Sequence, residues 1–333
     1  RFVKGNASER QATGEEVLNA FKNVGFVYLA QHSIPASQLA GVFDHSKRFF
    51  ELSLQEKKKL AWVSPQANRG YVAPGREKVT QLTDKAAVAA LREASPDLKE
   101  SLEIGKEPST DFHNNWPAHD PSFRPAMMRF FADCHALHLD VLDAVALGLG
   151  LSPRFFVPFC DKMDHNLRLL HYPGVPRSLL DKGEQARAGA HTDYGSITLL
   201  FQDGQGGLQV RDPATGQFAH APPVPGAVAV NAGDMLSRWS NDIIRSTEHR
   251  VVSPPTAPAR ASPAAEFAAA GDGGDGGAVG RCPARYSVAF FCNPNWDAVI
   301  DCLPGCHSPA RPARYPPVRC HDYLVGRLAA TYA

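Results

Sequence analysis

The sequence predicts a mainly β protein with flanking helices, built on a double-stranded β-helix, or jelly roll. Three observations lead to this prediction. From residue 167 onward, short β-branched and apolar runs alternate with turns rich in Gly and Pro. Before that point, apolar residues recur at helical spacing. The chain of 333 residues is long enough for one large β core with helical additions.

Helices dominate the predicted N-terminal half. Residues 14–24 form the first amphipathic pattern, which Gly25 ends, and residues 36–59 form the second. A strand is expected over 25–29, between the two helices. The longest helix candidate spans 123–148 and repeats apolar side chains along one face, as expected of a helix that braces a sheet.

Short strands are predicted in the second half of the chain. Each is a run of apolar and β-branched residues, and turn pairs such as Asp203-Gly204 and Pro225-Gly226 stand between them. Together they suffice for two facing sheets, as in a jelly roll. The candidates are residues 167–171, 189–193, 196–202, 207–211, 227–231, 249–252 and 285–292.

We divide the chain into four regions on this basis: residues 1–122, a helical region with a strand; 123–160, the bracing helix; 161–297, the jelly-roll core; and 298–333, a C-terminal loop and helix. The core is interrupted by 254–283, a stretch rich in Pro, Ala and Gly that contains a single Phe. Such a composition buries too little apolar surface to order itself. We therefore expect a disordered surface insertion, or a retained intron in the gene model.

The charge balance excludes several classes of partner. Lys and Arg number 35 against 34 Asp and Glu, so the net charge is only +1. We expect neither nucleic acid nor an anionic membrane as a partner, and no apolar run reaches the length of a transmembrane helix. A small molecule is the expected ligand, and the sequence does not indicate an oligomeric state.

The seven cysteines favour a reducing compartment. Their number is odd and their spacing irregular, which predicts free thiols and a cytoplasmic protein. The alternative is a zinc site drawn from Cys302, Cys306 and His307 together with Cys320 and His321. Its loose spacing in a proline-rich stretch argues against zinc. We favour scattered thiols in a C-terminal loop.

A candidate metal centre lies between residues 191 and 249. His191 and Asp193 are two residues apart, so an extended backbone projects both side chains to the same face. His249 begins a later strand-like segment. Two imidazoles and one carboxylate form the facial triad of non-haem Fe(II) oxygenases, which leaves coordination positions open. The alternative for the His-x-Asp pair alone is a capped turn or a solvated strand end.

An arginine and a hydroxyl share one face of a later strand. By strand parity Arg285 and Ser287 point the same way, and Ala289, Phe291 and Asn293 continue that face. An arginine on an otherwise apolar strand is costly to bury without an anion. A guanidinium with a hydroxyl beside it suits a carboxylate. The alternative is a surface arginine on an edge strand.

The order His191-x-Asp193, His249, Arg285-x-Ser287 resembles the Fe(II)/2-oxoglutarate-dependent dioxygenases of the isopenicillin-N-synthase-like branch. Five further segments share the resemblance: 25–34, 97–105, 167–173, 206–210 and 230–235. It implies Fe(II) on His191, Asp193 and His249, and the distal carboxylate of 2-oxoglutarate on Arg285 and Ser287. It also implies use of O₂, release of CO₂ and succinate, and hydroxylation of a substrate.

The chain departs from this branch at three places. Relatives begin with a short apolar strand, which is missing before Phe2, so we expect an incomplete N-terminus. Relatives connect the strands that carry His249 and Arg285 by a much shorter loop. Many have Asn where this chain has Leu170, two residues before Tyr172, so a cosubstrate contact is lost or replaced.

The substrate is suggested by a narrower resemblance. Segments 67–82, 187–191 and 290–295 are similar to the fungal thymine hydroxylases, which oxidise the methyl group of a pyrimidine. A flat ring would stack on Phe291, for which the alternative is a core aromatic, and polar groups would bind its edge. The candidate pocket residues are Asn68, Tyr71, Arg187, Phe291 and Asn293.

Two alternative functions remain open at this point. Segment 167–173 is also typical of oxygenases of fungal secondary metabolism, whose chemistry ends in hydroxylation, desaturation or ring closure. A catalytically idle, iron-binding relative is the second alternative. The five residues implied to bind iron and 2-oxoglutarate are all present, which favours an enzyme.

Overall fold

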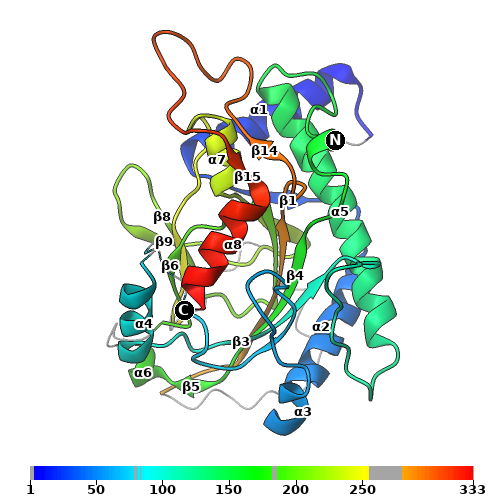
Figure 1. Cartoon of the computed structure of the whole chain (residues 1–333), viewed down its shortest axis with the longest axis vertical. Helices are drawn as coiled ribbons and strands as arrows, with labels where there is room; N and C mark the ends of the chain where they lie inside the picture. Colours follow the sequence, from blue (N-terminus) through cyan, green and yellow to red (C-terminus); the bar gives the residue numbers. More distant parts are fainter. Residues whose placement is uncertain are drawn as a thin grey trace.

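The computed structural model describes residues 4–78, 80, 82, 84–181, 186–254 and 280–332. Two antiparallel sheets form its core, and the long helix α5 runs along the outside of the larger one (Figure 1). The larger sheet has the order β1-β10-β7-β13-β4-β3-β2, and the smaller sheet has the order β6-β11-β8-β9. This arrangement confirms the predicted jelly roll with flanking helices.

The strands of the larger sheet are β1 (Phe26–Ala30), β2 (Gly70–Val72), β3 (Glu100–Gly105), β4 (Asn166–Tyr172), β7 (Ile197–Gln202), β10 (Ala227–Ala232) and β13 (Arg285–Cys292). Those of the smaller sheet are β6 (Ala188–His191), β8 (Leu208–Arg211), β9 (Phe218–His220) and β11 (His249–Val251). Two short ribbons pair β5 (Val175–Pro176) with β12 (Arg281–Cys282), and β14 (Val299–Ile300) with β15 (Val318–Arg319).

The α-helices are α1 (Ala7–Asn23), α2 (Ala36–Phe50), α3 (Leu54–Lys58), α4 (Lys85–Ala94), α5 (Phe123–Gly148), α6 (Arg177–Asp181), α7 (Asp234–Trp239) and α8 (Cys320–Thr331). Helix α1 begins at a capping box, in which the Asn6 side chain accepts from Glu9 N and the Glu9 side chain accepts from Asn6 N. It ends before Gly25, whose φ of +79° suits glycine.

The two faces of the larger sheet differ in polarity, and this difference positions the site. Outward-facing side chains such as Phe201 and Phe290 pack on α5, where they meet Phe130 and Phe131 at ring-centroid distances of 5.3 and 4.9 Å. The inward face instead carries polar and charged residues, among them Arg285. The outer face therefore supplies the apolar core, while the inner face lines cavities between the sheets.

The predicted elements are largely confirmed, with two corrections. Helix α5 has the predicted bounds, but the helix expected over 36–59 is two helices, because Ser53 caps α3 by accepting from Glu56 N. Lys57, near the end of that predicted helix, is 7% exposed, and its Nζ lies 2.8 Å from Glu100 Oε2. Glu100 arrives from β3, a strand outside our strand candidates, so no local pattern indicated this pair.

Two of the predicted regions are connected by the larger sheet. Strands β2 and β3, from the first 122 residues, extend this sheet beside β4. Most of the insertion predicted over 254–283 lies outside the described residues. The last residues of the insertion are described: there β12 pairs with β5 and anchors the chain before β13. Within the described residues, no helix has the length and apolarity needed to span a membrane.

We expect the contact between α5 and the sheet to dominate stability. Phe130 is fully buried against Phe201, so Phe130→Ala should lower the free energy of unfolding by about 3–5 kcal/mol. Val63 is 67% exposed, and Val63→Ala should change the free energy of unfolding by less than about 0.5 kcal/mol. Urea denaturation followed by circular dichroism measures both changes, and equal midpoints for the two variants would contradict this account.

Candidate active site

The three candidate metal ligands meet at one edge of the smaller sheet. His191 ends β6 and His249 begins β11, and the two residues are direct partners in the antiparallel ladder. The Asp193 Oδ1 atom lies 3.8 Å from His191 Nε2 and 3.6 Å from His249 Nε2. One detail differs from the expectation: β6 stops at His191, so Asp193 reaches this position from the following turn rather than from the strand.

Backbone carbonyls fix the tautomer of both imidazoles. His191 Nδ1 lies 2.7 Å from Gly189 O, and His249 Nδ1 lies 3.1 Å from Thr247 O. A carbonyl only accepts, so each Nδ1 carries the hydrogen and each Nε2 presents a lone pair toward Asp193. The sequence did not identify these partners, because each depends on a local backbone fold two residues upstream.

The second oxygen of Asp193 is held from the larger sheet. Asp193 Oδ2 accepts from Thr198 Oγ1 at 2.6 Å and from Asn231 Nδ2 at 2.8 Å. Burial by itself raises the pKa of Asp193. The neighbouring His249 and His191, together with these hydrogen bonds, outweigh burial and hold the pKa below its usual value. Burial, followed by the neighbouring His249, lowers the pKa of His191 to about 3. A carboxylate beside a neutral imidazole is the protonation state that a divalent metal requires.

A cavity runs inward from these ligands to Arg285. Its wall includes the hydroxyl of Ser287, the ammonium of Lys99 and the apolar side chain of Leu170. Arg285 is fully buried, and its guanidinium donates to Ser287 Oγ and to Gln202 Oε1, at 3.1 Å each. In the described part of the chain no carboxylate pairs with it, so the cavity presents a buried cation that lacks an anion.

Lys99 is a second cation of this cavity, and no sequence motif pointed to it. It is 4% exposed, and its Nζ pairs with Glu77 Oε2. Its charge contributes to the lowering of the pKa of His191, after burial and His249. Lys99 therefore places a cation on the wall of the cavity that His191 and Leu170 also line.

A second, larger pocket adjoins the same ligands. It is lined from the loop before β2, from β4, from the end of β13 and from α8. Three predicted pocket residues, Asn68, Phe291 and Asn293, line it. Asn68 also accepts from Trp62 Nε1 at 3.0 Å.

Two other predicted pocket residues lie elsewhere. The Tyr71 hydroxyl donates to Glu100 Oε2 at 2.5 Å, and its ring packs in the main core. Arg187 is fully buried and donates to the backbone carbonyls of Pro173 and Pro283, so it ties two loops together. Both residues were suggested because they lie within the matching segments 67–82 and 187–191. The structure instead turns Tyr71 of β2 into the core and places Arg187, directly before β6, between two loops.

The structure adds Arg168 and Tyr194 to the pocket. The Arg168 guanidinium carbon lies 5.2 Å from the centre of the Phe291 ring, and its nitrogens pair with Glu77 at 3.0 Å and Glu103 at 2.7 Å. The Tyr194 hydroxyl meets Thr331 Oγ1 of α8 at 2.8 Å. An arginine on the apolar strand 167–171 was a usable signal for Arg168, by the same parity argument that identified Arg285.

Comparison with known proteins agrees with this geometry. The family described as the 2OG-Fe(II) oxygenase superfamily matches residues 163–294, and the family "non-haem dioxygenase in morphine synthesis N-terminal" matches residues 1–126. The crystal structure of Neurospora crassa thymine-7-hydroxylase in complex with alpha-KG and thymine has a TM-score of 0.86 and 44% identity. The similarity covers 99% of this chain and 95% of that one.

Two curated fungal relatives show the same similarity along nearly the whole chain. The 2-oxoglutarate-dependent dioxygenase frbA of Dothideomycetidae sp. is 36% identical, over 91% of this chain and 86% of its own. The proline hydroxylase buaE of Petromyces alliaceus is 33% identical, over 99% of this chain and 97% of its own. The chain therefore belongs to the 2OG-Fe(II) oxygenase superfamily and is a 2-oxoglutarate-dependent dioxygenase that uses Fe(II).

Proposed function

We propose that this dioxygenase hydroxylates the methyl group of thymine or of a related pyrimidine. The observation that carries the proposal is that the larger pocket and the inner cavity share His191, Asp193, Arg168 and Phe291 as wall residues. A substrate in the pocket and a cosubstrate in the cavity would therefore meet at the metal ligands. The balanced reaction joins substrate, 2-oxoglutarate and O₂ and yields the hydroxymethyl product, succinate and CO₂.

His191, Asp193 and His249 are the proposed iron ligands. Two Nε2 lone pairs and one carboxylate oxygen converge, and their other polar atoms are occupied by Gly189 O, Thr247 O and the partners of Asp193. The set fits a non-haem Fe(II) site with open positions. When bound, Fe(II) and 2-oxoglutarate together supply the activation of O₂.

Arg285, Ser287 and Lys99 are the proposed ligands of 2-oxoglutarate. Arg285 and Ser287 would take the distal carboxylate, and Lys99 would take the carboxylate beside the keto group, because its charge acts near His191. The cosubstrate is a dianion, so its distal carboxylate would supply the anion that Arg285 lacks, and its other carboxylate would share Lys99 with Glu77. Many members of the branch have Asn at the position of Leu170. Lys99 would then replace the cosubstrate contact that such an Asn makes.

The pocket chemistry supports a flat, polar-edged substrate. Phe291 presents a ring, Arg168 lies against it, and Asn293 adds polar groups at the rim. A planar heterocycle would stack on the ring while its carbonyl groups accept hydrogen bonds. The similarity to the Neurospora crassa hydroxylase solved with thymine, and to the same enzyme solved with 5-formyluracil, supports a pyrimidine.

A secondary-metabolite oxygenase is the second candidate. The curated relatives include frbA and ppzD, and the proline hydroxylase buaE, at 33–36% identity. These relatives favour a different small molecule in the same pocket. We further propose that the enzyme belongs to the isopenicillin-N-synthase-like branch, and that it acts in the cytoplasm, because all seven cysteines are free.

Succinate release tests the substrate. With Fe(II), 2-oxoglutarate and O₂ present, thymine should raise succinate release well above the substrate-free rate, with one 5-hydroxymethyluracil formed per additional succinate. Uracil lacks the methyl group and is the matched control. If thymine gives no increase while proline or another small molecule does, the pyrimidine assignment fails and the dioxygenase chemistry stands.

Binding to the metal-free protein tests the two carboxylate sites separately. Compared with 2-oxoglutarate, 4-oxopentanoate has a methyl group in place of the carboxylate beside the keto group. Lys99→Met should weaken 2-oxoglutarate binding by roughly tenfold and leave 4-oxopentanoate binding unchanged, because an ionic hydrogen bond is lost with one ligand only. Arg285→Gln should weaken both. Calorimetry measures the affinities.

The control for this experiment is Lys57→Met. Lys57 is also a buried lysine, paired with Glu100 at 2.8 Å, but it lies outside the cavity. Its loss should leave both affinities unchanged. If Lys99→Met weakened the two ligands equally, the proposed contact with the inner carboxylate would be wrong.

The groups that hold Asp193 should set the affinity for iron. Thr198→Val removes the hydroxyl that donates to Asp193 Oδ2 while keeping the side-chain shape, and should weaken Fe(II) binding about tenfold or more. Thr13→Val is the matched control, because the Thr13 hydroxyl donates to Glu9 O within α1, away from the metal ligands. Competition against a chelator under anaerobic conditions measures both. Unchanged Fe(II) affinity in Thr198→Val would contradict the proposed role of Asp193.

A further inference from the structure

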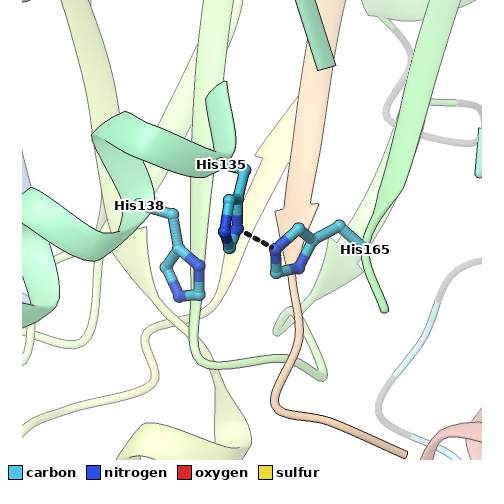
Figure 2. Close-up of side chains that lie close together, drawn as sticks. All are labelled: His135, His138 and His165. Carbon is cyan, nitrogen blue, oxygen red and sulfur yellow. Dashed lines mark hydrogen bonds between the residues drawn. The ribbon is translucent and has the colours of Figure 1, made fainter. Parts of the chain in front are cut away.

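Three histidines meet behind the substrate pocket, outside the proposed iron site. His135 and His138 lie on α5, and His165 precedes β4; Figure 2 shows their rings turned toward one another. One nitrogen of each lies within 4.8 Å of the others, and His138 and His165 are almost fully buried. Such a cluster has two interpretations, a second metal site and a hydrogen-bond relay.

Hydrogen-bond directions decide between them at His165. The backbone N–H of Asn293 donates to His165 Nδ1 at 3.0 Å, so this nitrogen has no hydrogen of its own. A neutral imidazole then carries its hydrogen on Nε2, which lies 2.9 Å from His135 Nδ1 and donates to it. The nitrogen that faces the cluster is therefore a donor, whereas a metal ligand must present a lone pair there.

His138 is oriented in the opposite sense. Ser196 Oγ donates to Cys292 O at 2.8 Å, so it accepts from His138 Nε2 at 3.0 Å. His138 Nδ1 is left with a lone pair that has no partner among the described residues. Burial lowers the pKa of His138 to about 3, and burial also holds the pKa of His165 well below its usual value. Both imidazoles are therefore neutral, as these hydrogen-bond directions require.

We propose that His165 and His138 are positioning residues that fix the substrate wall relative to the metal ligands. His165 holds the backbone of Asn293, whose side chain lines the pocket. His138 acts through Ser196, three residues after Asp193, and thereby holds Cys292, the residue before Asn293. Both contacts converge on the end of β13, one from His138 on α5 and the other from His165, directly before β4.

The end of β13 is closely packed at this point. Cys292 O also accepts from the backbone N–H of Ser196 at 2.8 Å, and the Asn293 side chain donates to Asp164 O at 2.9 Å. A Cβ on Gly195 would come within 2.4 Å of Cys292 O. The turn after Asp193 therefore touches the pocket wall directly, so a shift of β13 would move the substrate against the metal centre.

Exchange of each histidine for Asn and for Gln tests the relay. The amide of Asn reproduces the position of Nδ1, and the longer Gln reproduces that of Nε2. His165→Asn therefore keeps an acceptor for Asn293 N–H and His165→Gln loses it. At residue 138 the order is reversed, because His138→Gln keeps the donor to Ser196 and His138→Asn loses it. All four variants carry the same neutral amide group, and the two variants at each position differ by one methylene.

Two measurements follow on the Fe(II)-loaded full chain. Amide hydrogen exchange at Asn293 should be unchanged in His165→Asn and roughly threefold to tenfold faster in His165→Gln, the loss expected of one hydrogen bond. The KM for thymine, the proposed pocket substrate, should rise by a similar factor in His165→Gln and His138→Asn. It should stay near the parent value in His165→Asn and His138→Gln. The KM for 2-oxoglutarate should stay constant in all four.

The consequence for KM rests on the proposed function, whereas the exchange experiment does not. If no pyrimidine is turned over but the exchange pattern appears, the relay stands and the substrate assignment fails. Equal effects of Asn and Gln at each position would overturn the relay. Stoichiometric binding of a second metal ion, measured by adding Zn(II) to the iron-loaded protein and lost in all four variants, would also overturn it in favour of a metal site.

Discussion

The pairing of β11 with β6 is the contact on which the chemistry depends, because it places His249 directly opposite His191. Those two residues lie far apart in the sequence, and a shift of one residue in the register would turn one imidazole to the opposite face of the sheet. Asp193 completes the set from the turn that leaves β6, and the larger sheet holds its second oxygen through Thr198 and Asn231. The candidate metal centre is thus built where the two sheets of the jelly roll meet.

The inner face of the larger sheet carries buried charge that is only partly compensated within the chain. Glu77 pairs with both Lys99 and Arg168, and Arg168 also pairs with Glu103. Arg285 has no carboxylate partner among the described residues, so the cavity is poised for an anionic ligand. Buried ion pairs cost desolvation energy and contribute little net stability. The ion pairs here are therefore explained better by the binding and orientation of a ligand than by a contribution to folding stability.

Sequence patterns identified the residues whose role is carried by local spacing. His191-x-Asp193 and Arg285-x-Ser287 are both i, i+2 pairs, and strand parity places the second pair on β13. Asp193 lies beyond the end of β6, so the turn after the strand, rather than parity, brings it beside His191. Lys99 was missed because its importance depends on Glu77 and on a cavity formed by distant strands. Tyr71 was misplaced for the converse reason: its partner, Glu100, comes from β3 and draws the hydroxyl into the core. Tertiary pairing of this kind leaves no local signal.

Substrate choice and chemistry are carried by different parts of the chain. The proposed metal ligands and the proposed cosubstrate cavity lie on the two sheets, whereas the pocket is closed by α8 and by the loop before β2. These covering segments are joined to each other, since Trp62, ahead of β2, stacks on Tyr332, directly after α8, at 4.2 Å. Changes in the cover can therefore alter the pocket without disturbing the proposed metal ligands.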